Sequence, residues 1–166
     1  VEEAGAQLFL GEPSWITKAS TKRCGRRAAI IVRPNSRAFQ LTPNAKDVNH
    51  KILLESGRWV EVALPIGDGT KYIIIACLYG VAGASSDSLA KLQNAKLLGA
   101  ALKRQAEYSD IPYYICTDLN ENPGRCEVLQ AVIEAKCVSD LPVHWLGGVD
   151  LEPQPTHCRP QVYEGM

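Results

Sequence analysis

The sequence predicts an α/β protein with a mixed sheet, which forms one half of a two-sheet sandwich flanked by helices. Short strand-like apolar segments come first, a long helical segment and a further strand follow, and a second capped helix precedes a loop-rich end. This order of elements is typical of α/β architectures. The chain has 166 residues, of which 46% are hydrophobic and 22% are charged, so we expect residues 1–166 to form a single domain.

The N-terminal part contains two expected strands. Gln7 to Leu10 is expected to be a short buried strand that stops before Pro13, because proline cannot donate a hydrogen bond to a ladder. Glu12 therefore lies at the carboxyl end of a strand. Residues 28–32 are expected to form the second strand, with residues 38–41 as its hairpin partner.

Two longer strands are expected next. Residues 58–64 alternate, with Val60 on one face and Glu61 on the other, which predicts a half-exposed strand. Residues 67–69 turn the chain, and residues 71–79 form a continuous apolar strand. These segments together predict an antiparallel meander whose last strand is central and buried.

Helices and one more strand complete the expected fold. Side-chain oxygens at residues 85–87 can cap a helix that runs to about Tyr108, and the strand of residues 113–117 follows it. Asn122 is expected to cap a second helix with Pro123 at its first position. The long helix is expected to turn these apolar residues toward the sheet: Leu89, Leu92, Leu97, Leu98, Ala101 and Leu102.

Charge and cysteine content narrow the class of protein. Lys and Arg number 18, as do Asp and Glu, which argues against binding nucleic acid by net charge alone. Residues 13–46 contain no acid but several bases, including Arg26 and Arg27, so this segment either attracts phosphate or is a solvated loop balanced elsewhere. The six widely spread cysteines fit free thiols in an intracellular protein. Apolar runs stay well short of the roughly 20 residues of a membrane span, so no membrane association is expected.

The residues that indicate chemistry follow the strand of residues 113–117. Asp118 and Asn120 are two apart on an extended stretch and therefore point to the same side, just before a capped helix. Ligands of open α/β sheets bind beyond the carboxyl ends of strands, and helix N-termini suit phosphate. A carboxylate and an amide there can hold a water for attack and donate to a phosphoryl oxygen. Alternatively, both residues are turn formers.

Several segments together resemble the endonuclease/exonuclease/phosphatase superfamily. Residues 10–15 (Leu-Gly-Glu-Pro-Ser-Trp) resemble its "LQE" segment, and residues 25–33 resemble the strand that follows. Residues 77–80 (Cys-Leu-Tyr-Gly) are similar to its "N-x-Y" strand end, residues 112–120 to "P-hydrophobics-G-D-x-N", and residues 155–156 to a Pro-Thr pair before the final strands. The matches occur in family order along nearly the whole chain.

The resemblance implies a four-layer, two-sheet sandwich that hydrolyses phosphoesters with Mg²⁺, or alternatively Mn²⁺. It implies that Glu12 coordinates the metal, that Asp118 orients or deprotonates the attacking water, and that Asn120 helps to hold the phosphate or metal. It further implies that Tyr79 donates to the phosphate or stabilises developing charge. Arg26 and Arg27 are the expected substrate-binding residues, with the nucleic-acid phosphate backbone as the partner; the sequence identifies no protein partner.

The family's usual first strand with its Asn, its Arg-Ile-Asp strand and its Ser-Asp-His motif have no counterpart in the sequence. We therefore expect a domain that is incomplete at both ends and, without the catalytic His, poorly active. The leading hypothesis is a DNA endonuclease domain of the retrotransposon type. The alternatives are a non-catalytic remnant that binds nucleic acid or phosphate, and a phosphatase that acts on a small or lipid substrate.

Overall fold

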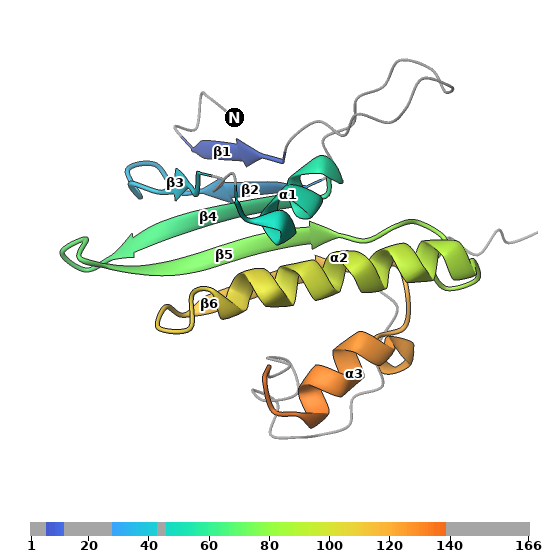
Figure 1. Cartoon of the computed structure of the whole chain (residues 1–166). Coiled ribbons are helices and arrows are strands. Elements are labelled where there is room, and N and C mark those ends of the chain that lie inside the picture. Colours follow the sequence, from blue (N-terminus) through green and yellow to red (C-terminus); the bar gives the residue numbers. More distant parts are fainter. Residues whose placement is uncertain (1–5, 12–27, 43–45, 139–166) are drawn as a thin grey trace, which may run out of the picture.

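A computed structural model of the chain describes residues 6–11, 28–42 and 46–138 (Figure 1). From residue 59 onward, the elements follow the predicted order of strands, a long helix, a further strand and a second helix. In chain order they are β1 (Gln7–Leu10), β2 (Ala29–Val32), β3 (Phe39–Gln40), α1 (Val48–Glu55), β4 (Trp59–Ile66), β5 (Lys71–Tyr79), α2 (Ser88–Ala106), β6 (Tyr113–Asp118), the 3₁₀ turn η2 (Pro123–Arg125) and α3 (Glu127–Glu134).

The strands form two sheets, and the larger one is mixed. Strands β1 and β2 make a two-stranded antiparallel sheet, and the second sheet has the order β3-β4-β5-β6. Its first three strands are the expected meander, whereas β6 runs parallel to β5. One predicted pairing is wrong: residues 38–41 do not pair with β2, because Phe39 lies opposite Ala63 of β4.

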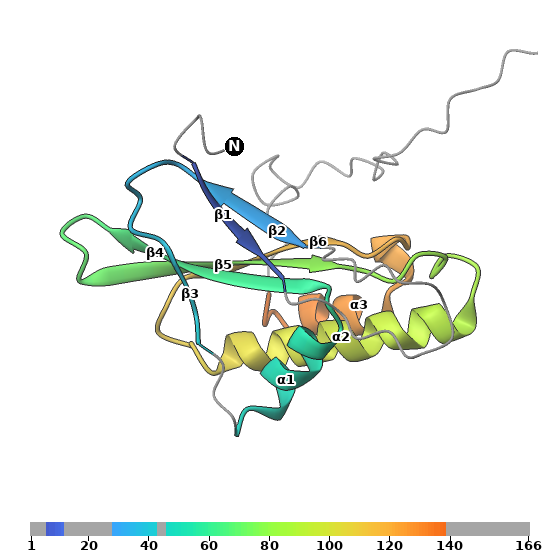
Figure 2. The same cartoon turned by 90° about the horizontal axis from the view of Figure 1, so that it is seen from above.

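The described residues form three layers, with the larger sheet between the small sheet and the helices (Figures 1 and 2). One core lies between the two sheets and includes Val60 and Val62. The other lies between the larger sheet and all three helices and includes Trp59 and Leu98. The mixed α/β sandwich predicted from the order of elements is confirmed.

Strand β4 corrects the prediction of a half-exposed strand. Its alternation is as predicted, since Val60 and Val62 face the small sheet while Trp59 faces the helices. Both faces are covered, however, so every residue from 59 to 63 is buried, including Glu61 at 1% exposure. The sequence pattern showed which residues share a face, but it did not show that a second layer covers the polar one.

Helix α2 has the predicted extent, but its buried face differs from the prediction. Asp87 caps it by accepting from the N–H of Leu89 at 2.8 Å. Leu89 and Leu92 are 62% and 66% exposed, so the prediction that they face the sheet is wrong. The buried face instead carries Ala90, Asn94, Leu97, Leu98, Ala100, Ala101 and Arg104.

The remaining helices differ from expectation in smaller ways. Helix α1, capped by Asp47, was not expected from the sequence. Asn122 caps the 3₁₀ turn η2 rather than α3, which begins only at Glu127 after Cys126. Within the described part of the chain, no helix combines the length and the apolar character that crossing a membrane requires.

Candidate active site at the carboxyl ends of β5 and β6

The parallel pairing of β5 and β6 brings two of the predicted site residues together. Tyr79 and Asp118 are register partners at the carboxyl ends of their strands. Cys77, two residues before Tyr79, packs against the core between the two sheets. Because side chains alternate along a strand, Tyr79 and Asp118 share the face that looks toward the small sheet. Both are half-buried, so a ligand at this edge can reach them.

Asn120 joins this pair through the turn that follows β6. Its backbone is left-handed, with φ of 53°, a conformation that asparagine tolerates better than most residues. Its N–H donates to Oδ1 of Asp118 at 3.1 Å, and its Nδ2 donates to the carbonyl of Gly80 at 3.2 Å. The structure therefore brings Tyr79, Asp118 and Asn120 together, but through a left-handed turn at Asn120 and not through the extended stretch that the sequence predicted. The roles of the three residues stay predictions.

The two strand ends touch at Gly80. Its N–H donates to the carbonyl of Asp118 at 2.6 Å. A Cβ at this position would lie 2.6 Å from the backbone Cα, C and O of Leu119, closer than side chains approach backbone. Only glycine therefore allows the loop after β5 to lie directly on the loop that carries Asp118 and Asn120.

We expect the substitution Gly80→Ala to lower the free energy of unfolding by about 1–3 kcal/mol, the usual cost of inserting a methyl group into packed structure. Urea denaturation measures this change. The matched control is Gly99→Ala, because a Cβ at this half-buried position of helix α2 would meet nothing within 4 Å. That control should raise stability by about 0.5–1 kcal/mol. Equal effects of the two substitutions would contradict the close contact.

Arg58 supports the same strand end, and the sequence did not single it out. Its Nη1 donates to the carbonyl of Gly80 and, at 3.4 Å, to the carbonyl of Tyr79. Its guanidinium also lies 5.7 Å from the centre of the Tyr79 ring. The arginine thus fixes the backbone of residues 79–80 and stacks on the aromatic side chain beside Asp118.

The other predicted ligands lie outside the described residues: Glu12, Arg26 and Arg27. Gly11, directly before Glu12, donates to the carbonyl of Ala28 at 2.9 Å, and a Cβ on it would lie 2.6 Å from the carbonyl oxygen of Trp59. Since Trp59 pairs with Leu78, strand β1 ends at the same edge as β5.

Asp118 and Asn120 offer oxygen donors of the kind that Mg²⁺ prefers. Within the described ranges, no group of three or more His, Cys, Asp and Glu side chains is arranged to hold a metal ion. Glu12, the predicted metal ligand, lies outside those ranges, so its role stays a prediction.

A small hollow of about 70 Å³ lies between the loops that follow β5 and β6, and two cationic side chains flank it, Lys91 and Arg125. The rest of its lining is Ala84, Ser85, Glu121 and Asn122. Neither cation was identified as a candidate from the sequence. Lys91 and Arg125 line this hollow together with Glu121 and Asn122, which follow Asn120 in the chain, and two cationic side chains there can attract a phosphate backbone.

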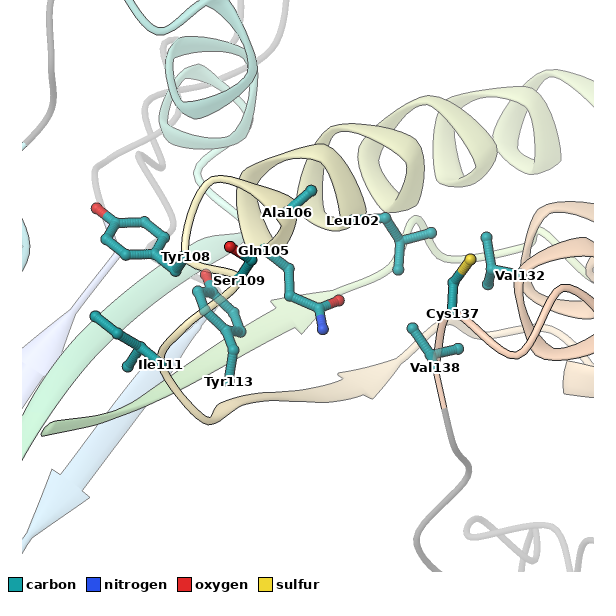
Figure 3. A pocket seen from close by; sticks show the side chains of 10 residues that line it. All are labelled: Leu102, Gln105, Ala106, Tyr108, Ser109, Ile111, Tyr113, Val132, Cys137 and Val138. Carbon is teal, nitrogen blue, oxygen red and sulfur yellow. The ribbon is translucent and has the colours of Figure 1, made fainter.

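The larger cavity, of about 310 Å³, lies elsewhere (Figure 3). It is lined by the end of helix α2, the start of β6 and the residues that follow helix α3, with Gln105, Tyr108, Tyr113 and Cys137 among them. Tyr113 begins β6 and Asp118 ends it, so this cavity lies at the opposite end of the strand from the candidate site.

A buried cluster of charged side chains joins helices α1 and α2 to the larger sheet, and sequence analysis did not find it. Arg104 donates to Oδ2 of Asp47 at 2.8 Å and to Oε2 of Glu61 at 3.3 Å. Tyr113 donates to Oε1 of Glu61 at 2.9 Å, and His50 Nε2 lies 3.5 Å from Oε2 of Glu61. Apart from Tyr113, the cluster consists of four titratable side chains, all of them buried: Asp47, His50, Glu61 and Arg104.

Electrostatics define the charge states within this cluster. Burial, together with the charge of Arg104, lowers the pKa of His50 below its usual 6.5, so His50 is neutral at pH 7. Although burial raises the pKa of Asp47, the N–H of His50 and the charge of Arg104 outweigh it and hold that pKa below its ordinary value. Burial and the neighbouring Glu61 raise the pKa of Tyr113, which stays a hydrogen-bond donor. The cluster is therefore a set of ion pairs that holds the helices on the sheet.

Comparisons with known proteins bear on the fold alone. No protein-family profile matches the sequence, and no curated protein is significantly similar to it. Among solved structures, the human Nocturnin catalytic domain with a bound sulfate anion is similar, with a TM-score of 0.60 and 13% sequence identity. The match covers 92% of this chain, which spans 57% of the length of that structure. The chain therefore shares the fold of that catalytic domain over most of its length.

Proposed function

We propose that this chain is a metal-dependent phosphoester hydrolase domain that acts on DNA as an endonuclease. The observation that carries the proposal is the meeting of Tyr79, Asp118 and Asn120 at one edge of the larger sheet. Their types match the chemistry: a carboxylate to accept a proton from water, an amide to hold an oxygen, and a phenol to donate to developing charge. The retrotransposon-type assignment rests on the sequence resemblance.

The contacts suggest how the chain's own residues divide the work. Asp118 accepts the N–H of Asn120 on one oxygen, which fixes the direction in which its carboxylate can face a water. One N–H of the Asn120 side-chain amide donates to the carbonyl of Gly80. The second N–H of this amide and its Oδ1 can therefore face a phosphate or a metal ion. A bound Mg²⁺, with Glu12 as its proposed ligand, would supply neutralisation of the phosphate charge.

Two observations support a phosphate substrate, and one of them favours a polymeric one. The Nocturnin structure contains sulfate, a tetrahedral oxyanion like phosphate. Lys91 and Arg125 flank a hollow on the loops beside the candidate site, where a neighbouring phosphate of a nucleic acid can bind. Arg26 and Arg27 are proposed to extend this basic surface.

A DNA-binding measurement tests the polymeric substrate. We expect the double substitution K91E/R125E to weaken binding of a short DNA duplex and to reduce the slope of log K against log salt by about 1 for each phosphate that the variant no longer neutralises. Fluorescence anisotropy over a series of salt concentrations gives both quantities. The matched control is K51E/K103E, which reverses two charges at exposed positions on helices α1 and α2.

The same experiment separates the competing functions. An equal loss for both double variants would contradict a site at Lys91 and Arg125. Nicking of supercoiled plasmid by the chain with Mg²⁺, stopped by EDTA, would support the proposed hydrolase. DNA binding without nicking would favour the non-catalytic remnant, and the absence of both, with hydrolysis of a small phosphate ester, would favour the phosphatase.

A further inference from the structure

Asn94 is a buried polar residue on the inner face of helix α2. It is 1% exposed, and its helix buries mostly Ala and Leu around it. A buried amide without partners costs free energy, so an asparagine at such a position requires specific hydrogen bonds. Both polar atoms of its side-chain amide form hydrogen bonds. Oδ1 accepts from the N–H of Val81 at 2.6 Å. Nδ2 donates to the carbonyl of Leu119 at 2.5 Å and to Oε1 of Glu121 at 3.3 Å.

These partners belong to the two loops that carry the candidate site. Val81 follows Tyr79 by two residues, and Leu119 lies between Asp118 and Asn120. Leu119 packs into the core on the helix side of the sheet, and its neighbours on either side belong to the candidate site. The side chain of Asn94 thus connects the loop after β5 and the loop after β6 from the helix side of the sheet.

We infer that Asn94 is a positioning residue, which sets the distance between the loop after β5 and the turn that carries Asp118 and Asn120. The inference rests on the proposed function for its catalytic consequence, but its structural part stands on the hydrogen bonds alone. Without Asn94, the partly buried N–H of Val81 and the buried carbonyl of Leu119 lose their partner, and the loops must move to find another.

Asparagine is the side chain that the geometry requires. The N–H of Val81 needs an acceptor, whereas the carbonyl of Leu119 needs a donor, so the two ends of the amide are assigned by their partners. Aspartate offers only acceptors at neutral pH, and leucine has a similar size but offers neither. Substitutions at position 94 can therefore remove the donor alone or both functions.

The experiment compares N94D and N94L by hydrogen exchange of the chain. In N94D the acceptor for Val81 remains, but the new carboxylate faces the carbonyl of Leu119 and the carboxylate of Glu121. We expect exchange at Asn120 to rise about tenfold or more while Val81 stays protected. In N94L we expect both amides to exchange faster. Ile74, buried at the centre of β5, should be unchanged in both variants.

Kinetics give the second readout. We expect N94D to lower kcat for plasmid nicking by about 10²-fold, because small displacements of catalytic groups are costly, and to leave KM for DNA unchanged. The double variant N94D/E121Q should recover part of the loss, since it removes the opposing carboxylate. The matched control is Q93E, which makes the same amide-to-carboxylate change at the preceding, exposed residue.

The outcomes separate the two proposals. Unchanged exchange at Asn120 in N94D, or the same exchange pattern in N94D and Q93E, would overturn the role of Asn94. If the wild-type chain does not hydrolyse DNA, the proposed function fails, and the exchange pattern still decides the role of Asn94. A fall in kcat without faster exchange at Asn120 would also count against the inference.

Discussion

Replacing Arg104 with methionine is expected to lower the free energy of unfolding by about 3–5 kcal/mol at pH 7. The arginine is 3% exposed and pairs with Asp47 and Glu61, which are also buried. It also donates to Glu107 at 3.0 Å and to the hydroxyl of Tyr108 at 2.7 Å. Methionine fills much of the same space but leaves two buried carboxylates without their cation, and the cost of these uncompensated charges dominates. Urea denaturation monitored by circular dichroism measures the change.

The stability that R104M loses relative to wild type is also expected to depend on pH. Without Arg104, burial should raise the pKa of Asp47 in the folded state above its unfolded value, because the cation that opposes the effect of burial is gone. The folded variant then binds more protons than the unfolded chain, so its stability should increase as the pH falls from 7 toward the unfolded carboxyl pKa. The deficit of R104M relative to wild type should therefore be largest at neutral pH and smaller at pH 5.

Two further variants make the test specific. K103M changes the exposed neighbour on the same helix and should alter stability by less than about 0.5 kcal/mol. Adding E61Q to R104M should recover part of the loss, because glutamine removes one buried charge and its oxygen can still accept from Tyr113. A cost for R104M no greater than that of K103M would show that the ion pairs do not hold the helices on the sheet.

The sequence was sufficient for the parts of the site that depend on local order along the chain. Asp118 and Asn120 could be placed at the end of an apolar strand from the sequence. How they meet could not be derived from strand periodicity, because β6 ends at Asp118 and Asn120 lies in a left-handed turn. Tyr79 could be placed at a strand end in the same way, although its pairing with Asp118 depends on β5 and β6 being neighbours. The continuous apolar run of residues 71–79 and the capping side chains at residues 85–87 likewise predicted their elements.

The missed features depend on contacts between residues that are far apart in the sequence. Arg104 and Asp47 are separated by 57 residues, and nothing near either one indicates that it is buried. The inner face of helix α2 was predicted from its leucines, but close packing on the sheet favours its alanines, and it places Asn94 and Arg104 inside. A polar residue in a helix does not by itself reveal that its partners lie in two loops.

Replacing Asp118 with asparagine is expected to reduce the rate of DNA hydrolysis by about 10²–10⁴-fold, the usual contribution of a positioned general base. Asparagine has nearly the same shape, and its oxygen can still accept the N–H of Asn120, so the turn after β6 should keep its geometry. Loss of one negative charge beside the phosphate should leave DNA affinity unchanged or slightly higher. Plasmid nicking with Mg²⁺ and anisotropy of a labelled duplex measure the two quantities separately.

The matched control for D118N is D110N, which makes the same chemical change at an exposed aspartate before the other end of β6. Its nicking rate, affinity and stability should equal those of the wild-type chain. Nicking by D118N at the wild-type rate would exclude Asp118 as the base and leave the edge between β5 and β6 as a binding site only. Equal losses in D118N and D110N would instead point to a general effect of charge on substrate approach. Only a selective loss in D118N, with affinity retained, supports a base that acts in the chemical step.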